Sequence, residues 1–438
     1  MNNDKTYRNA FILVTTLFFT WGFLTVLVDS PISRFREIFT LSYFESGLVQ
    51  FAFFGAYFLL SIPAGYILTR IGYQKGIILG LVTMAIGCFL FYPAASLRMF
   101  GLFMLGYFIL AGGMTILQVA ANPYVAALGS EETSSSRLIL SQAFNSLGTA
   151  IAPSIGAIYF LSDKILSKEE IDLLDTKSRD LYFIGEASAV QGPFIFFGCF
   201  LIAIAMVFFF IKLPSLMAEK EGGTFLYAIT QKNLIYGVFG IFFYVGAEVA
   251  IGSYLVNYFL DMNLVESIQN NSIMNSIATF FKQDIFIKLD NGEYKYSSKA
   301  VFGLFVTFYW SGAMFGRFVG SYLTKIFQEG KVLSSFALAA ILLILLSAFS
   351  NGLISMWSIL AVGLFNSIMF PTIFTLSLSG LGNLKPKGSG LLCTGIVGGA
   401  IIPPLYGLLT DFMGFKIALV ILSLCYLYIA NFGRINSN

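Results

Sequence analysis

The chain has 438 residues, of which 57% are hydrophobic and only 11% are charged. A water-soluble protein of this length needs more charge to cover its surface, so the composition indicates a protein that is embedded in lipid. The small net charge of +3 argues against a nucleic acid partner. The chain contains no histidine, which excludes histidine-based metal sites and catalytic triads. Any proton chemistry must therefore use carboxylates.

Apolar runs long enough to cross a membrane recur along the whole sequence. A transmembrane helix needs about 20 apolar residues. The first run shows no cleavage pattern of a signal peptide and is interpreted as a span. The sequence therefore predicts an all-α integral membrane protein with about twelve transmembrane helices, expected at 9–31, 43–69, 76–95, 99–128, 137–161, 190–212, 230–260, 299–325, 332–350, 354–381, 388–410 and 415–433. Long polar connections are expected at 162–189, 213–229 and 261–298.

The two halves of the sequence resemble each other. The stretch from Gly65 to Arg70 ends the second predicted helix, and a similar stretch ends the eighth. Pro123 and Pro371 are expected to break the fourth and tenth helices. Pro153 in the fifth helix and Pro403 in the eleventh occupy corresponding positions in the two halves. Parallel repeats of this kind are typical of transporters with a site between their halves. We predict six-helix bundles at 1–212 and 230–438, joined by a cytoplasmic linker at 213–229.

The distribution of positive charge predicts the orientation in the membrane. Short cytoplasmic loops carry an excess of lysine and arginine. Both termini are therefore expected in the cytoplasm, because the loops on that side carry Lys5, Arg8, Arg70, Lys75, Lys325, Lys331, Lys385, Lys387 and Arg434, whereas the short loops opposite carry Arg34, Arg36, Arg98 and Lys416.

Two carboxylates lie inside predicted spans, away from the water at their ends. They are Asp29, late in the first helix, and Glu248, midway along the seventh. Ionisable groups inside a membrane are costly and indicate function, and helices 1 and 7 are equivalent in a six-plus-six repeat. Two alternatives remain: helix 1 ends before Asp29 and leaves it in water, or Glu248 only makes a structural hydrogen bond.

Amide side chains line one face of helix 4 and one face of helix 5. Thr115, Gln118 and Asn122 follow the helical spacing on helix 4, and Gln142 and Asn145 do so on helix 5. Amides both donate and accept hydrogen bonds, which suits a neutral ligand with many hydroxyl groups. The alternative is that these amides hold helices together.

Helices 8 and 10 offer further candidates. Asn366 is a buried-amide candidate on helix 10, and Trp310 on helix 8 could stack on the apolar face of a sugar ring. Arg317 is expected to extend to the membrane surface. The sequence contains no phosphate-binding GxxxxGK[ST] motif and no catalytic cluster, so we expect neither an enzyme nor an ATP-driven pump, and no metal site.

Four motifs carry a family resemblance that spans nearly the whole chain except 261–298. They are the stretches Gln118 to Gly129, with its Ala-Ala-Asn-Pro core, Leu140 to Gly148, Phe370 to Leu376, and Trp21-Gly22 followed by Asp29. The chain resembles the fucose/glucose/galactose branch of the sugar:proton symporters, within the major facilitator superfamily.

The resemblance implies a role for particular residues. Asp29 matches the proton-linked aspartate of the fucose-transporting members. Their essential glutamate on helix 4 is Gln118 here, and this departure makes the chain more similar to the glucose/galactose members. Conversely, their amide on helix 7 is Glu248 here, so which partner Glu248 serves stays open.

The sequence thus predicts import of a hexose such as D-glucose or D-galactose with protons, by alternating access, across a bacterial inner membrane. We expect no cofactor beyond the coupling ion H⁺, a monomer in the lipid bilayer, and a sugar as the partner. Sodium coupling and a drug:proton antiporter of the same fold are the alternatives. Asp29 is the expected proton-coupling residue, and the expected substrate contacts are Gln118, Asn122, Gln142, Asn145, Glu248, Asn366 and Trp310.

Overall fold

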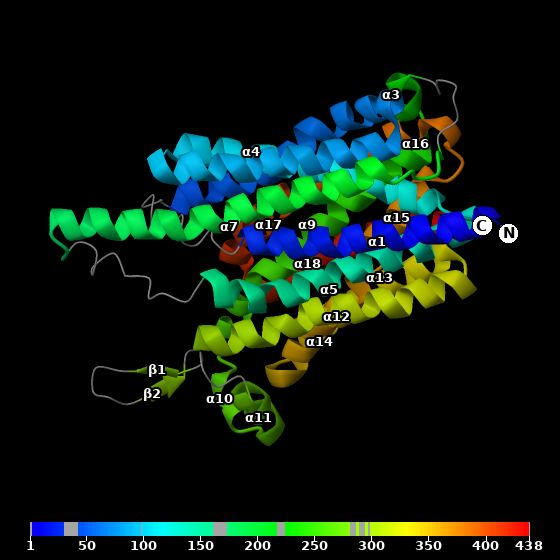
Figure 1. Cartoon of the computed structure of the whole chain (residues 1–438). Helices are drawn as coiled ribbons and strands as arrows, with labels where there is room; N and C mark the ends of the chain where they lie inside the picture. The colour runs from blue at the N-terminus through cyan, green and yellow to red at the C-terminus, as the bar shows by residue number, and fades with distance from the viewer. Residues whose placement is uncertain are drawn as a thin grey trace. The chain divides into compact units, whose positions relative to one another are not determined.

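The computed structural model describes residues 2–29, 43–97, 99–160, 173–216, 224–280, 286–288, 294–296 and 298–437. Nearly all of them are helical, and Figure 1 labels the main elements. Within these residues, nine segments are long and apolar enough to cross a membrane, and one of them, Phe51–Leu97, covers two of the predicted spans. This abundance of helix is expected in lipid, where each backbone N–H and C=O group must find its partner within the protein.

The first half of the chain forms five long helices. The boundary between the second and third predicted spans lies inside α3, at Gly72, whose backbone is not helical (φ 80°, ψ 168°). A residue without a Cβ atom adopts such an angle without strain, so the chain can turn back there. The elements are α1 (Asn2–Asp29), α3 (Tyr43–Leu97), α4 (Phe100–Ala127), the short η1 (Glu131–Thr133), α5 (Ser134–Phe160) and α7 (Thr176–Phe210).

The second half contains the remaining spans and several short elements. The strands β1 and β2 form an antiparallel hairpin in which Phe286 pairs with Tyr296. The elements are α8 (Phe225–Ile229), α9 (Lys232–Asp261), α10 (Val265–Gln269), α11 (Ser272–Phe280), β1 (Phe286–Lys288), β2 (Tyr294–Tyr296), α12 (Ser298–Ile326), α13 (Glu329–Phe349), α14 (Gly352–Asn366), α15 (Met369–Leu378), η2 (Gly382–Leu384), α16 (Lys385–Thr394), η3 (Gly395–Val397), α17 (Gly398–Met413) and α18 (Phe415–Ile435).

All twelve predicted spans correspond to helices in the structure. The tenth consists of α14 and α15, and the eleventh consists of α16, η3 and α17. All three predicted connections contain more structure than expected. The helix α7 already begins at Thr176, inside the polar segment 162–189, α8 lies inside 213–229, and the segment 261–298 contains α10, α11 and the hairpin. Polarity marks where a helix leaves the membrane, but helices also form in water, which explains these differences.

The two prolines expected to break helices behave differently. The helix α4 continues through Pro123 to Ala127, so the predicted break there is wrong. The tenth span is interrupted, as predicted, at Ser367 and Ile368, just before Pro371. A proline inside a helix removes one backbone hydrogen bond, and neighbouring side chains can replace the lost donor and keep the helix continuous.

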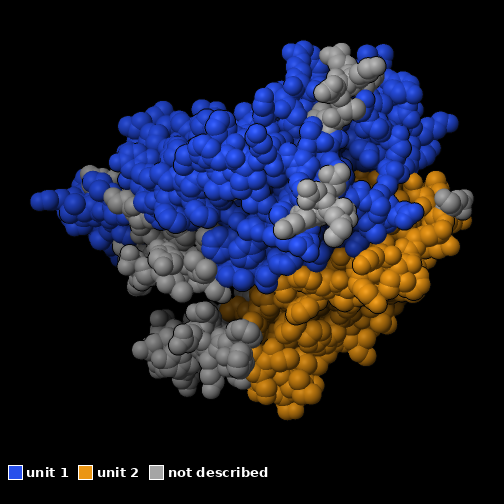
Figure 2. Space-filling model, turned by 45° about the vertical axis from the view of Figure 1, so that its right-hand side comes forward, with its two compact units in different colours: residues 1–238, 377–397 blue, residues 239–376, 398–438 orange. Residues whose placement is uncertain are grey.

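The chain divides into two compact units, shown in different colours in Figure 2. Unit 1 contains residues 1–238 and 377–397, and unit 2 contains residues 239–376 and 398–438. The segment 377–397 belongs to unit 1 because α16 packs against α3 and α4: Gly390 lies against Gly65, and the Ser389 hydroxyl donates to the Val119 carbonyl of α4 over 2.8 Å. The division at 212 and 230, which follows the sequence repeat, stays a prediction.

In unit 1, the backbones of α1 and α5 approach each other closely at two glycines. A Cβ atom on Gly148 of α5 would lie 2.3 Å from the Phe19 carbonyl oxygen of α1, and a Cβ atom on Gly22 would lie 2.2 Å from the Asn145 carbonyl oxygen. Small residues permit such contacts between membrane helices, where van der Waals packing replaces the hydrophobic effect as the driving force. Any larger side chain at these two positions would separate the helices.

In unit 2, buried hydroxyl groups connect three helices. The Tyr258 hydroxyl of α9 lies 2.9 Å from the Ser355 hydroxyl of α14 and 3.2 Å from the Ser347 hydroxyl of α13. Hydrogen bonds of this kind typically contribute about 0.6 kcal/mol each between membrane helices. They fix the position of α9, the helix that also carries Glu248, relative to α13 and α14.

Candidate functional site

Unit 1 brings together three of the predicted amides from α4 and α5. Asn122 and Gln142 are buried, and the Gln142 side-chain nitrogen donates to the Asn122 side-chain oxygen over 3.5 Å. Gln118, one helical turn before Asn122, is half-buried. The amide faces predicted on helices 4 and 5 therefore meet each other, although the roles of these residues stay predictions.

Two atoms of this amide group have no hydrogen-bond partner in the part of the chain that the structure describes. They are the acceptor Oε1 of Gln118 and the donor Nδ2 of Asn122, both buried. Leaving a buried polar atom without a partner costs about 1–3 kcal/mol. By contrast, the Thr115 hydroxyl donates to the Ala111 carbonyl of its own helix over 2.8 Å. One acceptor on Gln118 and one donor on Asn122 are thus left without a partner among the described residues.

Asn145 has a different environment from the other amides. Its side-chain nitrogen donates to the Phe18 carbonyl of α1 over 2.9 Å. The same residue lies against Gly22 at the close approach of α1 and α5. This contact favours the packing interpretation of Asn145, because its amide holds α5 against α1.

Asp29 is the last residue of α1, and its side chain lies outside the described part of the chain. The described part of the helix thus reaches Asp29, and the last two residues of the predicted span lie outside the described residues. One turn earlier, the Thr25 hydroxyl donates to the Trp21 carbonyl over 2.9 Å and lies 4.0 Å from the Met114 sulfur of α4. The final described turns of α1 therefore contact α4, the helix that carries Gln118 and Asn122.

In unit 2, Glu248 lies midway along α9 and is half-buried. The hydroxyl of Tyr244, one turn earlier, donates to Glu248 Oε1 over 2.7 Å, and Tyr244 itself is almost completely buried. The carboxylate expected from the sequence is therefore held inside the unit by a buried phenol.

Asn366 is linked to Glu248 through a tyrosine that the sequence did not single out. The Asn366 side-chain nitrogen donates to the Tyr309 hydroxyl oxygen over 2.7 Å, and that hydroxyl donates to the Glu248 backbone carbonyl over 3.3 Å. Asn366 and Tyr309 are both completely buried. The Asn366 side-chain oxygen has no hydrogen-bond partner within the described residues. Unit 2 thus holds a connected polar cluster on α9, α12 and α14.

Trp310 follows Tyr309 on α12 and lies at the edge of this cluster. Its side chain is 48% exposed, and its ring packs edge-on against Tyr309 with 5.0 Å between centroids. Gly252 leaves room for the ring, since a Cβ atom there would lie 2.7 Å from it. A half-exposed indole held in this way retains a free surface, but no polar contact among the described residues directs it toward a ligand.

Two prolines each leave one backbone carbonyl without its usual N–H donor, and a side chain from another helix donates to that carbonyl instead. Pro123 has no N–H group for the Val119 carbonyl, which instead accepts from the Ser389 hydroxyl. Pro371 likewise frees the Ser367 carbonyl, which accepts from Arg317 Nε over 3.3 Å. Arg317 Nε therefore contacts the backbone of unit 2, and the expected extension of its guanidinium to the membrane surface stays a prediction.

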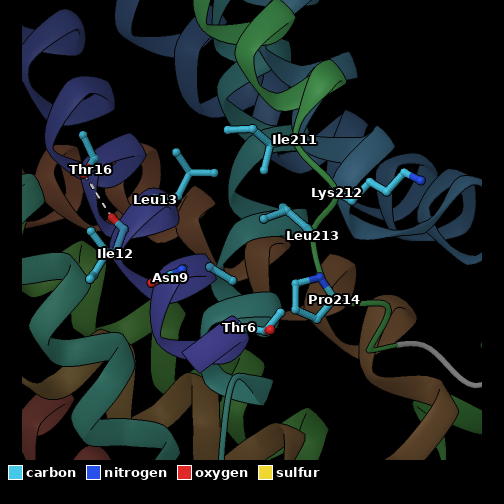
Figure 3. Close-up of a pocket in the computed structure, with 10 residues that line it drawn as sticks. Thr6, Asn9, Ile12, Leu13, Thr16, Ile211, Lys212, Leu213 and Pro214 are labelled. Atoms are coloured by element: carbon cyan, nitrogen blue, oxygen red, sulfur yellow. Dashed lines mark hydrogen bonds between the residues drawn. The ribbon is translucent and has the colours of Figure 1, made fainter. Parts of the chain in front are cut away.

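A separate cavity of about 510 Å³ lies in unit 1, between the beginning of α1 and the residues that follow α7 (Figure 3). The side chain of Gln74 fixes one wall, because its nitrogen donates to the Phe208 and Ile211 carbonyls over 2.7 and 2.6 Å. Figure 3 shows the Lys212 ammonium group pointing away from Asn9. None of the predicted site residues lines this cavity, whose walls are Thr6, Asn9, Ala10, Ile12, Leu13, Thr16, Ile211, Lys212, Leu213 and Pro214.

The sequence and the fold are similar to those of known transporters. The family model of the Major Facilitator Superfamily matches residues 10–392. The chain is 42% identical over 443 residues to the glucose/galactose transporter of Brucella abortus, covering 100% of this chain and 96% of that one. It is 32% identical over 444 residues to the L-fucose-proton symporter of Escherichia coli, covering 99% of this chain and 94% of that one.

The comparison of structures gives the same result. A crystal structure of the transporter FucP in the outward conformation matches with a TM-score of 0.86 and 31% identity, covering 99% of this chain and 100% of that one. The similarity therefore extends over both units and all twelve spans. The chain belongs to the Major Facilitator Superfamily, within its family of fucose/glucose/galactose:proton symporters, and is a transporter rather than an enzyme.

Proposed function

We propose that this protein imports a hexose, D-glucose, D-galactose or a close relative, together with protons, by alternating access of its two halves. The observation that carries this proposal is the unpaired acceptor and donor on Gln118 and Asn122. A sugar hydroxyl both donates and accepts, so one hydroxyl or a neighbouring pair satisfies both atoms without bringing a charge. A hydrophobic cation, the usual substrate of a drug antiporter, can at most donate to the Gln118 acceptor and carries no hydroxyl group that also accepts from Asn122.

The relatives support the choice of substrate. The relative from Brucella abortus is named a glucose/galactose transporter, and the one from Escherichia coli is named an L-fucose-proton symporter. The identity to the first is the higher of the two. Position 118 carries an amide in this chain, and the resemblance associates this amide with the glucose/galactose members. We therefore place the substrate among the hexoses with a full set of hydroxyl groups.

We propose Asp29 as the proton-coupling residue. It ends α1 and follows helical turns that contact α4, and the chain has no histidine to carry a proton instead. In this mechanism Asp29 takes a proton from outside before the sugar binds and releases it inside afterwards. The protein acts in the inner membrane of a bacterium, as a monomer with both termini in the cytoplasm.

The Gln118→Ala variant tests the amide site. It should bind the hexose roughly tenfold more weakly or worse, since 1.4 kcal/mol corresponds to a factor of ten and a buried hydrogen bond contributes a similar amount. The fold should persist, because Gln118 Oε1 has no partner within the described protein to lose. The measurement is hexose affinity of the purified protein, followed by tryptophan fluorescence or thermal shift.

A matched control lies one turn earlier on the same helix. Thr115→Val removes a hydroxyl that is already bonded within α4, so it should leave hexose affinity unchanged. The companion Gln118→Glu restores the acid of the fucose-transporting members and should raise the affinity for fucose. Equal hexose affinity in Gln118→Ala and wild type would assign Gln118 to helix packing.

A further inference from the structure

We propose that Glu248 determines which hexose is accepted: its free carboxylate oxygen accepts the hydrogen of one particular sugar hydroxyl, and Tyr244 and Tyr309 position it for this task. The inference rests on the proposed hexose function and goes beyond it, because it names the residue that selects and the chemical group that is selected. It also assigns positioning functions to these two tyrosines, which contact Glu248 in the folded protein.

The carboxylate of Glu248 has one occupied and one free oxygen. Oε1 accepts the Tyr244 hydroxyl over 2.7 Å. Oε2 has no hydrogen bond among the residues that the structure describes, although the charge of Arg317, also in unit 2, acts on this carboxylate, and the residue is half-buried. A carboxylate that serves packing alone would be expected to have both oxygens satisfied inside the protein. The free oxygen therefore fits a ligand that supplies a donor.

Contacts at both ends of the residue hold Glu248 in place. Tyr244 fixes the carboxylate, and the Tyr309 hydroxyl binds the backbone carbonyl of Glu248 over 3.3 Å. Tyr309 in turn accepts from Asn366 over 2.7 Å, so its hydroxyl hydrogen is directed toward Glu248. All three partners are buried and belong to unit 2. Both the side chain and the backbone of Glu248 are thus oriented before a ligand arrives, which reduces the entropy lost on binding.

The chemistry of a carboxylate makes the contact selective. An ionised carboxylate only accepts hydrogen bonds, so its ligand must donate, and the bond is stronger than one between neutral groups. A sugar in which the contacted hydroxyl is replaced by hydrogen or fluorine has no donor there. A site built to bind a hydroxyl rejects analogues that lack it, because its polar group is left unpaired. Glutamine at this position carries an N–H group as well, so it would tolerate fluorine.

The experiment measures affinities for sugars altered at one carbon at a time. The panel contains the monodeoxy and monodeoxy-fluoro derivatives of D-glucose and D-galactose at carbons 2, 3, 4 and 6, tested on wild type, Glu248→Gln and Tyr244→Phe. At one carbon, both the deoxy and the fluoro derivative should bind wild type roughly tenfold or more weakly than the parent sugar does. At the same carbon, the fluoro derivative should bind Glu248→Gln less than about threefold more weakly than the parent sugar does. Tyr244→Phe should retain the preference in weakened form.

Further variants separate selection from general damage. Glu266→Gln makes the same chemical change on the exposed helix α10 and should show the wild-type profile. Tyr309→Phe removes the contact to the Glu248 backbone together with the hydrogen bond from Asn366, leaves the carboxylate in place, and should weaken the same preference at the same carbon. If Glu248→Gln does not fold, Glu248→Asp and the two tyrosine variants carry the test, because each leaves an acid at position 248.

Three results would overturn the inference. Parallel profiles of wild type and Glu248→Gln would show that Glu248 touches no hydroxyl of the sugar. Equal tolerance of fluorine at every carbon in wild type would show that no carboxylate accepts a hydrogen there. Failure of wild type to bind any parent hexose would overturn the proposed function itself, and this outcome is distinct because the parent sugars are measured first.

Discussion

The Asp29→Asn variant should exchange hexose across a membrane but should no longer accumulate it against a gradient. Asparagine has nearly the shape of a protonated aspartate and cannot release a proton. The variant should therefore bind sugar as the protonated wild type does. A proton gradient should no longer drive sugar accumulation, because position 29 carries no proton across the membrane. Raising the pH should weaken sugar binding in wild type, whose Asp29 loses its proton, and should weaken it much less in Asp29→Asn.

Proteoliposomes loaded with hexose allow both activities to be measured on one preparation. Counterflow of labelled sugar reports exchange, and uptake under an inward proton gradient reports accumulation. Asp261→Asn, at the exposed end of α9, is the matched control and should accumulate sugar normally. Full proton-driven accumulation by Asp29→Asn would reject Asp29 as the coupling residue.

The Gly148→Ala variant should be markedly less stable than wild type. The new Cβ atom would lie 2.3 Å from the Phe19 carbonyl oxygen and 2.8 Å from the Phe23 nitrogen, both backbone atoms that cannot rotate away. The helices α1 and α5 would have to separate, and such overpacking typically costs about 1–3 kcal/mol. The separation would also lengthen the bond from Asn145 to the Phe18 carbonyl.

A second glycine provides the control for this experiment. A Cβ atom on Gly101 of α4 would meet no other atom within 4 Å, so Gly101→Ala should match or slightly exceed wild-type stability, since alanine restricts the unfolded chain. The midpoint of thermal unfolding in detergent, followed by size-exclusion chromatography, compares the variants. Equal midpoints for Gly148→Ala and Gly101→Ala would contradict the close approach of α1 and α5.

The sequence predicted the spans well because lipid imposes a simple rule on length and polarity. The boundaries of α4, α9 and α18 lie within two residues of the predicted ones at each end. The rule fails outside the lipid: it did not predict that α7 would begin at Thr176 or that α10 and α11 would form. It also cannot tell whether a proline interrupts a helix. The carbonyls freed by Pro123 and Pro371 both accept from a side chain of another helix, yet α4 stays continuous and the tenth span is interrupted.

The candidate site was predictable only in part. Glu248, Gln118 and Asn122 attract attention because polar groups in apolar runs are rare, and the structure brings Asn122 together with Gln142. Tyr309 carries no such signal, since the chain contains 22 tyrosines and most of them fit equally well in a core. Its contacts to Glu248 and Asn366 join three helices, and such a junction depends on tertiary packing that a single sequence does not encode locally.

The most direct test of the account is uptake by the wild-type protein in proteoliposomes, with a panel of hexoses and a set of imposed ion gradients. The account predicts saturable accumulation of D-glucose, D-galactose or a close relative under an inward proton gradient, abolished by a protonophore and independent of sodium. Uptake of hydrophobic cations with no uptake of any hexose would contradict it. Accumulation that strictly requires sodium would contradict the proton as the coupling ion.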